Sequence, residues 1–234
     1  MIDESALTGE LDGVPVPEAR RRALAGPQLA APVTTRISGV RHYALHGGGV
    51  MRVAVYGGSF DPPHVGHAMV ASWVRWTDLA DALWFLPAAD HAFGKALSPF
   101  PDRCAWLDAL CAELGPWASV STVEGDLPGP NYTIDTLNEL RRRHPDARLR
   151  LVVGADQRPA LPRWRRWDEI EADFSPIWVG RDGYPPETGA PVFPGVSSTE
   201  VRARLGAGDP ATGLITAGVR AAIRRTGVRY RPAP

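Results

Sequence analysis

Short apolar runs alternate with longer amphipathic segments from Met51 onward, and this pattern predicts an α/β fold. Apolar runs typical of buried strands cover residues 53–56, 82–86, 118–123, 149–153 and 176–179, with a short edge strand expected at 191–193. Helical periodicity covers residues 65–77, 101–114, 133–144, 168–173, 197–205 and 214–225. Strands that alternate with helices indicate a mostly parallel sheet with helices on both faces. Ligands of such sheets bind beyond the carboxyl ends of the strands, where the strand order reverses.

Residues 1–50 differ from the rest of the chain. They mix proline, glycine, alanine and scattered charges without a sustained period, and only a short helix around Glu18–Leu24 is expected there. Met51 stands directly before the first convincing strand. We therefore expect a single domain over residues 51–234, preceded by a disordered or non-native N-terminal extension, a loose tail, over residues 1–50.

Charge and cysteine content limit the kinds of partner. Lysine plus arginine and aspartate plus glutamate both number 26, so no net charge attracts nucleic acid or an anionic membrane. Cys104 and Cys111 lie about 10 Å apart along a predicted helix, too far for a disulfide, and free thiols are typical of a reducing compartment. Without a membrane-length apolar stretch or a signal-peptide layout, we expect a cytoplasmic protein with no membrane or nucleic-acid partner. The sequence leaves open whether it forms a homo-oligomer.

The most informative segment reads VAVYGGSFDPPHVGH over residues 53–67. Gly57 and Gly58 end the first apolar run and allow a sharp turn and a close approach to a ligand. His64 and His67 follow at the start of the next helix, whose free amide groups favour anions. A phosphate-handling site is the favoured interpretation. Two alternatives are a structural histidine pair and a zinc site, although zinc needs further ligands and only Asp61 is near.

A second segment, GVSSTEVR over residues 195–202, also begins a predicted helix. Ser197 and Glu200 fit a capping box, which is the purely structural interpretation. The functional interpretation is a second anion site, formed by the hydroxyl groups, free backbone N–H groups and the guanidinium of Arg202, which can hold a phosphate by two hydrogen bonds.

Two further segments carry candidate binding residues. Tyr132 offers an aromatic face to a flat ring, and Thr133 can cap the following helix. Asp156 follows the fourth strand and can accept from a ribose hydroxyl or help to hold a metal, while Trp164 can stack on a heterocycle. For each aromatic alone, packing is the simpler explanation. The glycine turn is neither a Walker A loop nor a dinucleotide fingerprint, and there is no nucleophile elbow.

Together these segments resemble the nucleotidyltransferase superfamily, whose two signatures stand here as GGSFDPPHVGH at 57–67 and VSSTEVR at 196–202. Within it, the chain resembles the bacterial nicotinate-nucleotide adenylyltransferases. That narrower resemblance rests on residues 131–137, 154–156 with 161–164, 179–185 and 227–230. It extends from about Met51 to Tyr230 and implies a Rossmann-like domain.

The resemblance implies adenylyl transfer from ATP to nicotinate mononucleotide, which yields deamido-NAD and pyrophosphate. Magnesium is implied as a cofactor that enters with ATP and has no protein side chain as ligand. His64, His67 and Arg202 are implied as catalytic. The implied ATP-binding set is Gly57, Gly58, Ser59, Phe60, His64, His67, Gly154, Asp156, Ser197, Ser198, Thr199 and Arg202. The implied acceptor-binding set is Ser59, Lys95, Tyr132, Thr133 and Trp164.

One segment departs from the family pattern. The family usually has a P-x-x-x-P-P-H-K loop after the second strand, whereas this chain has PAADHAFGK at 87–95, where His91 and Lys95 supply positive groups. The alternatives are therefore an adenylyltransferase for nicotinamide mononucleotide or phosphopantetheine, a cytidylyltransferase, and a nucleotide-binding regulatory module without catalysis. All but the last require the histidines and the distal arginine to meet at one triphosphate.

Deletion of residues 1–50 tests the proposed domain boundary. A chain that starts at Met51 should fold and retain activity, because the predicted sheet and both motifs lie downstream of that residue. Solubility, circular dichroism and turnover of the purified deletion variant, compared with the full chain, measure this. An insoluble or inactive product would contradict the prediction.

Overall fold

The computed structural model describes residues 10–11, 14–15, 50–89, 97–184 and 190–230. In the N-terminal extension it contains two short strands, β1 (Glu10–Leu11) and β2 (Val14–Pro15), which pair antiparallel. The rest of that extension lies outside the described residues, together with the expected helix at 18–24. The expectation of a loose tail therefore stays a prediction.

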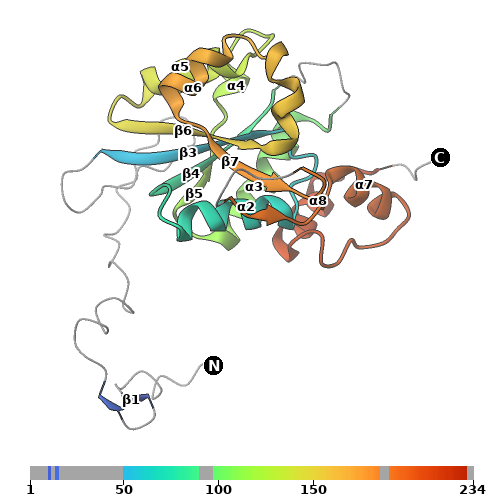
Figure 1. The fold of residues 1–234 in the computed structure, drawn as a ribbon. Helices are drawn as coiled ribbons and strands as arrows, with labels where there is room; N and C mark the ends of the chain where they lie inside the picture. Colours follow the sequence, from blue (N-terminus) through green and yellow to red (C-terminus); the bar gives the residue numbers. More distant parts are fainter. Residues whose placement is uncertain (1–9, 12–13, 16–49, 90–96, 185–189, 231–234) are drawn as a thin grey trace.

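Six parallel strands form the central sheet (Figure 1). They are β3 (Met51–Gly58), β4 (Ala82–Pro87), β5 (Ala118–Val120), β6 (Ala147–Gly154), β7 (Ile177–Arg181) and β8 (Val192–Phe193). Their order in the sheet is β5-β4-β3-β6-β7-β8. The chain runs outward from β3 to one edge, then returns to the centre at β6 and runs to the other edge. This is the strand order of a Rossmann-like fold and confirms the expected architecture.

Helices cover both faces of the sheet. On one face lie α4 (Val123–Asp126), α5 (Thr133–Arg143) and α6 (Trp167–Phe174), and on the other lie α2 (Val65–Trp76), α3 (Phe100–Leu114) and α8 (Ala217–Thr226) (Figure 1). The helix α7 (Ser198–Gly206) packs on the second face through the buried Val201. A 3-10 helix, η2 (Ala155–Arg163), directly follows β6.

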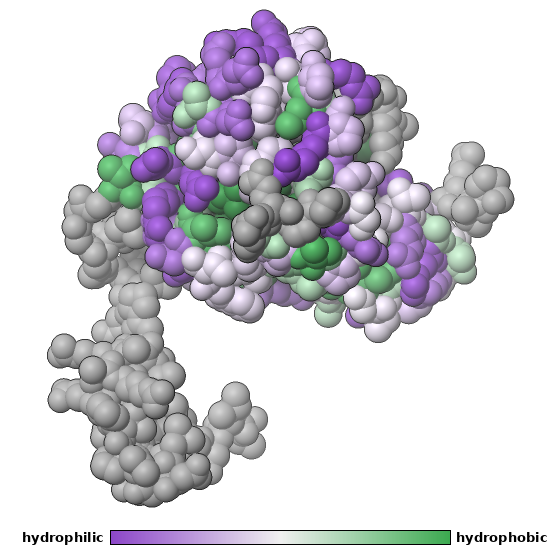
Figure 2. Space-filling view, viewed as in Figure 1, coloured by the Kyte–Doolittle hydropathy of each residue, from purple (hydrophilic) through white to green (hydrophobic). Residues whose placement is uncertain are grey.

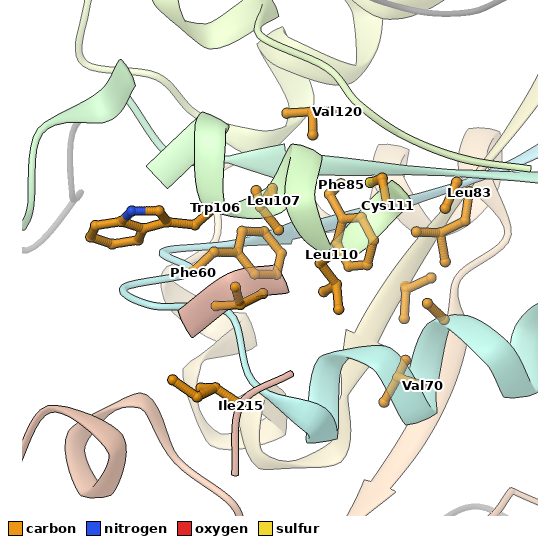
Figure 3. Close-up of a cluster of buried hydrophobic side chains, with 14 of the residues drawn as sticks. Phe60, Val70, Leu83, Phe85, Trp106, Leu107, Leu110, Cys111, Val120 and Ile215 are labelled. Atoms are coloured by element: carbon orange, nitrogen blue, oxygen red, sulfur yellow. The ribbon is translucent and has the colours of Figure 1, made fainter. Parts of the chain in front are cut away.

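The strands send alternate side chains into two separate cores. On β3, Val53 and Val55 belong to the core under α5 and α6, whereas Ala54 belongs to the core under α2, α3 and α8. Because both faces are covered, the strand sequences are almost continuously apolar. In the second core, Phe60 lies edge-to-face on Phe85 with ring centroids 5.5 Å apart (Figure 3).

Local structure departs from the sequence pattern in three places. The strand expected at 118–123 ends at Val120, and Val123–Asp126 form the four-residue helix α4, which buries Val123. The helix η2 was missed because Pro159 and Pro162 interrupt the helical pattern, whereas short 3-10 turns accept such residues. The apolar Trp76 is 80 % exposed, because it lies at the last turn of α2.

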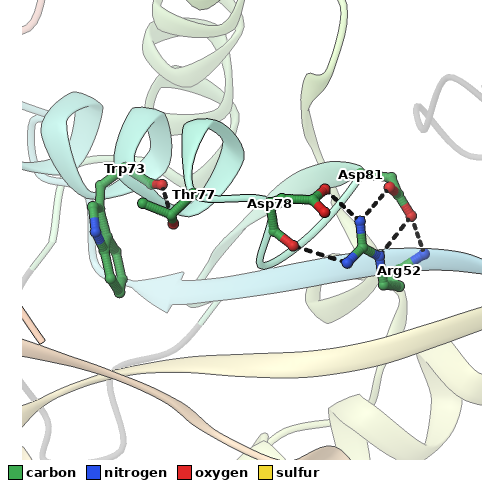
Figure 4. Close-up of polar contacts among 5 residues, drawn as sticks. All are labelled: Arg52, Trp73, Thr77, Asp78 and Asp81. Atoms are coloured by element: carbon green, nitrogen blue, oxygen red, sulfur yellow. Dashed lines mark hydrogen bonds and ion pairs between the residues drawn. The ribbon is translucent and has the colours of Figure 1, made fainter. Parts of the chain in front are cut away.

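Ion pairs stabilise the end of the sheet that is remote from the strands' carboxyl ends. Arg52 at the start of β3 bonds to Asp78 at 2.6 Å and Asp81 at 2.8 Å, and so ties the α2–β4 connection to the strand (Figure 4). Hydrophilic residues also gather over α5 and α6 (Figure 2), where Arg141 pairs with Asp173. Charged side chains thus cover the outer helices and leave the carboxyl ends of the strands for the site.

Candidate functional site

A cavity of about 650 Å³ opens where the strand order reverses. The pairing of β3 with β6 ends at Tyr56 and Val152, whereas the pairing of β3 with β4 continues to Gly58 and Pro87. The central strand therefore leans toward β4 at its carboxyl end and separates from β6. This separation creates the crevice in which parallel sheets of this order bind ligands.

The cavity gathers nearly every predicted site residue that the structure describes. Its lining includes Gly57, Gly58, Ser59, Phe60, His64, His67, Thr133, Gly154, Asp156, Trp164, Ser197, Ser198, Thr199 and Arg202. Tyr132 is not among the lining residues; its ring lies under the guanidinium of Arg165 at 4.9 Å. Lys95 and His91 lie outside the described residues.

The two glycines after β3 serve different purposes. A Cβ on Gly57 would meet no described atom within 4 Å, so its absence leaves open space on the cavity wall. A Cβ on Gly58 would stand 3.0 Å from the ring of Phe60. Phe60 itself adopts a left-handed backbone with φ 48° and is 1 % exposed. The glycine turn is therefore held by an aromatic anchor in the core, while its other side faces the cavity.

The two histidines form a stacked pair at the start of α2. Their ring centroids are 3.7 Å apart, and Nδ1 of His67 accepts a hydrogen bond from the backbone N–H of His64 at 3.1 Å. In a neutral imidazole this leaves the proton of His67 on Nε2. Nδ1 of His64 is buried and has no hydrogen-bond partner within the described part of the chain. An unpaired buried polar atom costs free energy, and a bound ligand would relieve that cost.

Burial keeps both imidazoles neutral. It lowers the pKa of His64 to about 4, with a smaller contribution from the charge of Arg181. The pKa of His67 lies well below its ordinary value, first through burial and then through His64 and Arg181. At neutral pH the pair therefore offers hydrogen bonds to an anion but no positive charge.

The start of α7 faces this pair. Ser197 caps the helix by accepting from the backbone N–H of Glu200 at 3.1 Å, which is the Ser197 half of the expected capping box, whereas the Glu200 carboxylate accepts from Arg204. Arg202, one turn later, donates to the hydroxyl of Thr199 at 3.2 Å. The first N–H groups of a helix are free to bind an anion, and Arg202 adds a permanent charge beside them.

Two hydrogen bonds join the distal segment to the first motif. The hydroxyl of Ser198 donates to the carbonyl of Pro62 at 3.0 Å, and Nη1 of Arg202 donates to the carbonyl of Asp61 at 2.7 Å. These residues are 136 and 141 positions apart in the chain. The histidine pair and the serine-threonine-arginine turn thus lie on one wall of the same cavity, as the sequence required.

The end of β7 supplies an arginine to which the sequence analysis gave no role. Arg181, at the carboxyl end of β7, lines the cavity and reaches Asp156 at 3.3 Å and the carbonyl of Val196 at 3.3 Å. Its place at the end of a predicted strand was the available signal. A Cβ on Gly154 would overlap Oδ1 of Asp156, so this glycine makes room for the carboxylate.

The opposite end of the cavity is lined by α4, the start of α5 and η2. Glu124 and Asn131, both missed from sequence, line it beside Thr133 and Trp164. Glu124 is 8 % exposed and accepts from the backbone N–H of Ala89 at 3.0 Å. Burial raises the pKa of this carboxyl group. No local pattern identified Glu124, because the surrounding proline and glycine residues indicated a loop.

Three further features of the described residues concern metal binding, membrane-spanning helices and the cysteines. They contain no group of three histidine, cysteine, aspartate or glutamate side chains that could hold a metal ion. None of their helices is both long and apolar enough to span a bilayer. Cys104 and Cys111 are both buried and form no disulfide, in agreement with the helix spacing.

The histidine pair predicts that stability falls in mild acid. Between pH 7.5 and 5.5 the unfolded chain protonates histidines near pH 6.5, whereas the folded pair stays neutral, so the free energy of unfolding should drop by about 1 kcal/mol per histidine. Urea denaturation at both pH values measures this. The double variant His64→Asn/His67→Asn, which cannot titrate there, should lose most of the drop. An equal drop in both proteins would contradict the burial argument.

Comparison with known proteins agrees with this geometry. A family model described as cytidylyltransferase-like matches residues 55–204. A probable nicotinate-nucleotide adenylyltransferase from Anaeromyxobacter sp. (strain K) is 43 % identical over 170 residues, which cover 71 % of this chain and 90 % of the relative. One so named from Myxococcus xanthus (strain DK1622) is 40 % identical over 179 residues, 76 % of this chain and 94 % of the relative.

Among solved structures, the Plasmodium falciparum nicotinic acid mononucleotide adenylyltransferase complexed with NaAD superposes with a TM-score of 0.62. The match covers 76 % of this chain and 97 % of that one, at 16 % identity, and it shows the shared fold. The sequence relatives carry the assignment further, because they are at least 40 % identical to this chain over at least 90 % of their own length. The chain therefore belongs to the cytidylyltransferase-like nucleotidyltransferases and, among these, to the nicotinate-nucleotide adenylyltransferases.

Proposed function

We propose that this cavity transfers the adenylyl group of ATP to nicotinate mononucleotide, giving deamido-NAD and pyrophosphate. The observation that carries the proposal is the junction of the two motifs. Arg202 and Ser198 bond to the backbone of Asp61 and Pro62 and so bring the α7 terminus to the histidine pair. Only in this arrangement can a single triphosphate contact both segments.

The reaction needs positioning more than covalent chemistry. An oxygen of the mononucleotide's phosphate attacks the α-phosphorus of ATP. The new P–O bond forms as the bond to the bridging β-oxygen breaks, and pyrophosphate leaves with that electron pair. The attacking phosphate is already ionised at neutral pH, so no side chain must remove a proton. Alignment of the two nucleotides and stabilisation of the charge that develops on pyrophosphate then account for catalysis.

We assign the triphosphate to the end of the cavity formed by α2 and α7. Neutral His64 and His67 donate hydrogen bonds to the triphosphate oxygens, and Arg202 binds the β- and γ-phosphates. Arg181, held loosely by two contacts of 3.3 Å, adds a second cation. Gly57, Gly58, Ser59 and Phe60 follow the nucleotides, and Ser197 and Thr199 present the start of α7. Magnesium enters as part of the MgATP substrate.

The adenosine and the acceptor occupy the remaining walls in this proposal. Gly154 and Asp156 border the adenosine, with Asp156 accepting from a ribose hydroxyl. The acceptor end, defined as the part lined by Ala88, Glu124, Asn131, Thr133 and Trp164, receives the pyridine mononucleotide. Trp164 stacks on the ring, and Tyr132 and Lys95 complete the acceptor-binding set expected from the family resemblance.

Pyrophosphate release with different acceptors tests the proposal. The purified chain with MgATP should turn over nicotinate mononucleotide faster than nicotinamide mononucleotide, and phosphopantetheine should give no signal above background. A preference for another acceptor would assign one of the alternative activities to the chain instead. Absence of turnover with all three would favour a regulatory module. Because neither Cys104 nor Cys111 is in a disulfide, we propose the reducing cytoplasm as the place of this reaction.

Replacement of Arg202 should remove much of the triphosphate stabilisation. We expect Arg202→Ala to lower kcat/KM by roughly 100-fold or more, as for other single electrostatic donors. The matched control is Arg204→Ala on the same helix, whose guanidinium pairs with Glu200 at 2.8 Å and does not line the cavity. Steady-state kinetics should show near-normal activity for the control. Similar losses in both variants would point to damage of α7 and contradict the assigned role.

Replacement of His67 separates its structural contact from its proposed chemistry. Asparagine can keep the acceptor for the His64 N–H, but its amide does not reach the position of Nε2. We therefore expect His67→Asn to melt within a few degrees of the wild type, and both His67→Asn and His67→Ala to lose about 100-fold or more in kcat. Calorimetry and turnover measure the two effects. Near-normal turnover in His67→Ala would refute the assigned role.

A further inference from the structure

A buried guanidinium lies directly beneath the cavity. Arg103, in the first turn of α3, is 1 % exposed. It donates from Nε to the carbonyl of Ser98 at 2.9 Å, from Nη1 to that of Ser59 at 2.8 Å, and from Nη2 to that of Ala88 at 2.7 Å. No carboxylate of the described residues lies within 4 Å of it as an ion-pair partner. A buried charge without an ion-pair partner destabilises the folded state, which indicates that this guanidinium has a further role.

The three carbonyl groups belong to three separate segments. Ser59 follows the glycine turn of β3, Ala88 follows β4, and Ser98 precedes α3. Ser59 and Ala88 also line the cavity. The planar guanidinium has five donors that diverge in fixed directions, whereas the lysine ammonium has three donors at one point. Arginine is therefore the one side chain that can hold all three segments at fixed separations.

Two buried carboxylates hold the same segments from the other side. Asp61 accepts from the backbone N–H of Ser98 at 3.1 Å, and Glu124 accepts from the backbone N–H of Ala89 at 3.0 Å. Asp61 thus binds the same residue as Arg103 does, Ser98, and Glu124 binds Ala89, the neighbour of Ala88. The charges of Asp61 and Glu124 favour the protonated guanidinium of Arg103, and the contacts of this layer fix the floor of the acceptor end.

The triphosphate end has its own supports. The start of α2 is held by the bond from the backbone N–H of Val65 to the carbonyl of Leu214, at 2.8 Å. The start of α7 is held by Ser198 and Arg202 through the carbonyls of Pro62 and Asp61. None of these contacts uses the side chain of Arg103. Loss of its guanidinium should therefore move the acceptor end more than the triphosphate end.

From this arrangement we infer that Arg103 is a positioning residue for the acceptor mononucleotide. This inference rests on the proposed function above. It touches no substrate. It fixes Ser59 and Ala88 relative to each other, so that the acceptor phosphate meets the α-phosphorus of ATP in line. A displacement of about 1 Å in such a reaction costs roughly 100-fold in rate, so small shifts of these two segments matter.

Kinetics of Arg103→Lys and Arg103→Met test this inference. We expect KM for nicotinate mononucleotide to rise roughly tenfold or more and kcat to fall, while KM for ATP changes less than about threefold. The control is Arg150→Met on β6, because Arg150 also donates to a backbone carbonyl, that of Ser175 at 2.9 Å, but lies outside the cavity lining. The control should leave both KM values unchanged.

Several outcomes would overturn the inference. Equal rises in both KM values, or unchanged KM values with only a lower melting temperature, would make Arg103 a purely structural residue. Failure of both variants to fold would do the same. Titration calorimetry of the mononucleotide without ATP gives a second readout, in which Arg103→Lys should bind about tenfold more weakly. Wild-type protein that does not turn over nicotinate mononucleotide would refute the proposed function instead.

Discussion

The site depends on two hydrogen bonds between distant parts of the chain, from Ser198 to the carbonyl of Pro62 and from Arg202 to the carbonyl of Asp61. A hydrogen bond contributes about 1 kcal/mol, and one from a charged group about 1.5–3 kcal/mol. Their combined contribution is modest compared with the two cores. The two hydrogen bonds matter for the geometry of the site, because they align the free amides of α7 with the histidine pair. The strand order makes this possible by returning the chain to the centre of the sheet at β6.

The cavity obtains its positive charge from arginine and its neutral donors from histidine. Burial lowers the pKa of His64 to about 4 and keeps His67 neutral too, so neither imidazole is positively charged at neutral pH. Arg181 and Arg202 stay charged under all ordinary conditions. In the proposed reaction the substrate charge is therefore balanced by permanent cations, while the imidazoles supply directed hydrogen bonds. This division removes any need for a titrating catalyst, because phosphate attack requires no proton removal.

The two ends of the cavity rest on different parts of the fold. The α2 and α7 termini form one wall, whereas α4, α5 and the segment after β4 form the other. Arg103, Asp61 and Glu124 join the segments that follow β3 and β4 to the start of α3. In the proposed function, this separation allows acceptor specificity to vary without loss of the ATP site.

The sequence by itself determined the order of strands and helices, the parallel sheet and the residues of both motifs, because periodicity and turn chemistry act over a few neighbouring residues. It missed α4 and η2, where proline and glycine obscured the pattern. It gave no role to Arg103 or Glu124 and overlooked Arg181, although Arg103 lies in a predicted helix and the other two follow predicted strands. Their importance arises from partners 15 to 44 residues away and, for Arg103 and Glu124, also from burial. Only the tertiary structure decided these contacts, because strand order and burial are properties of the whole folded chain.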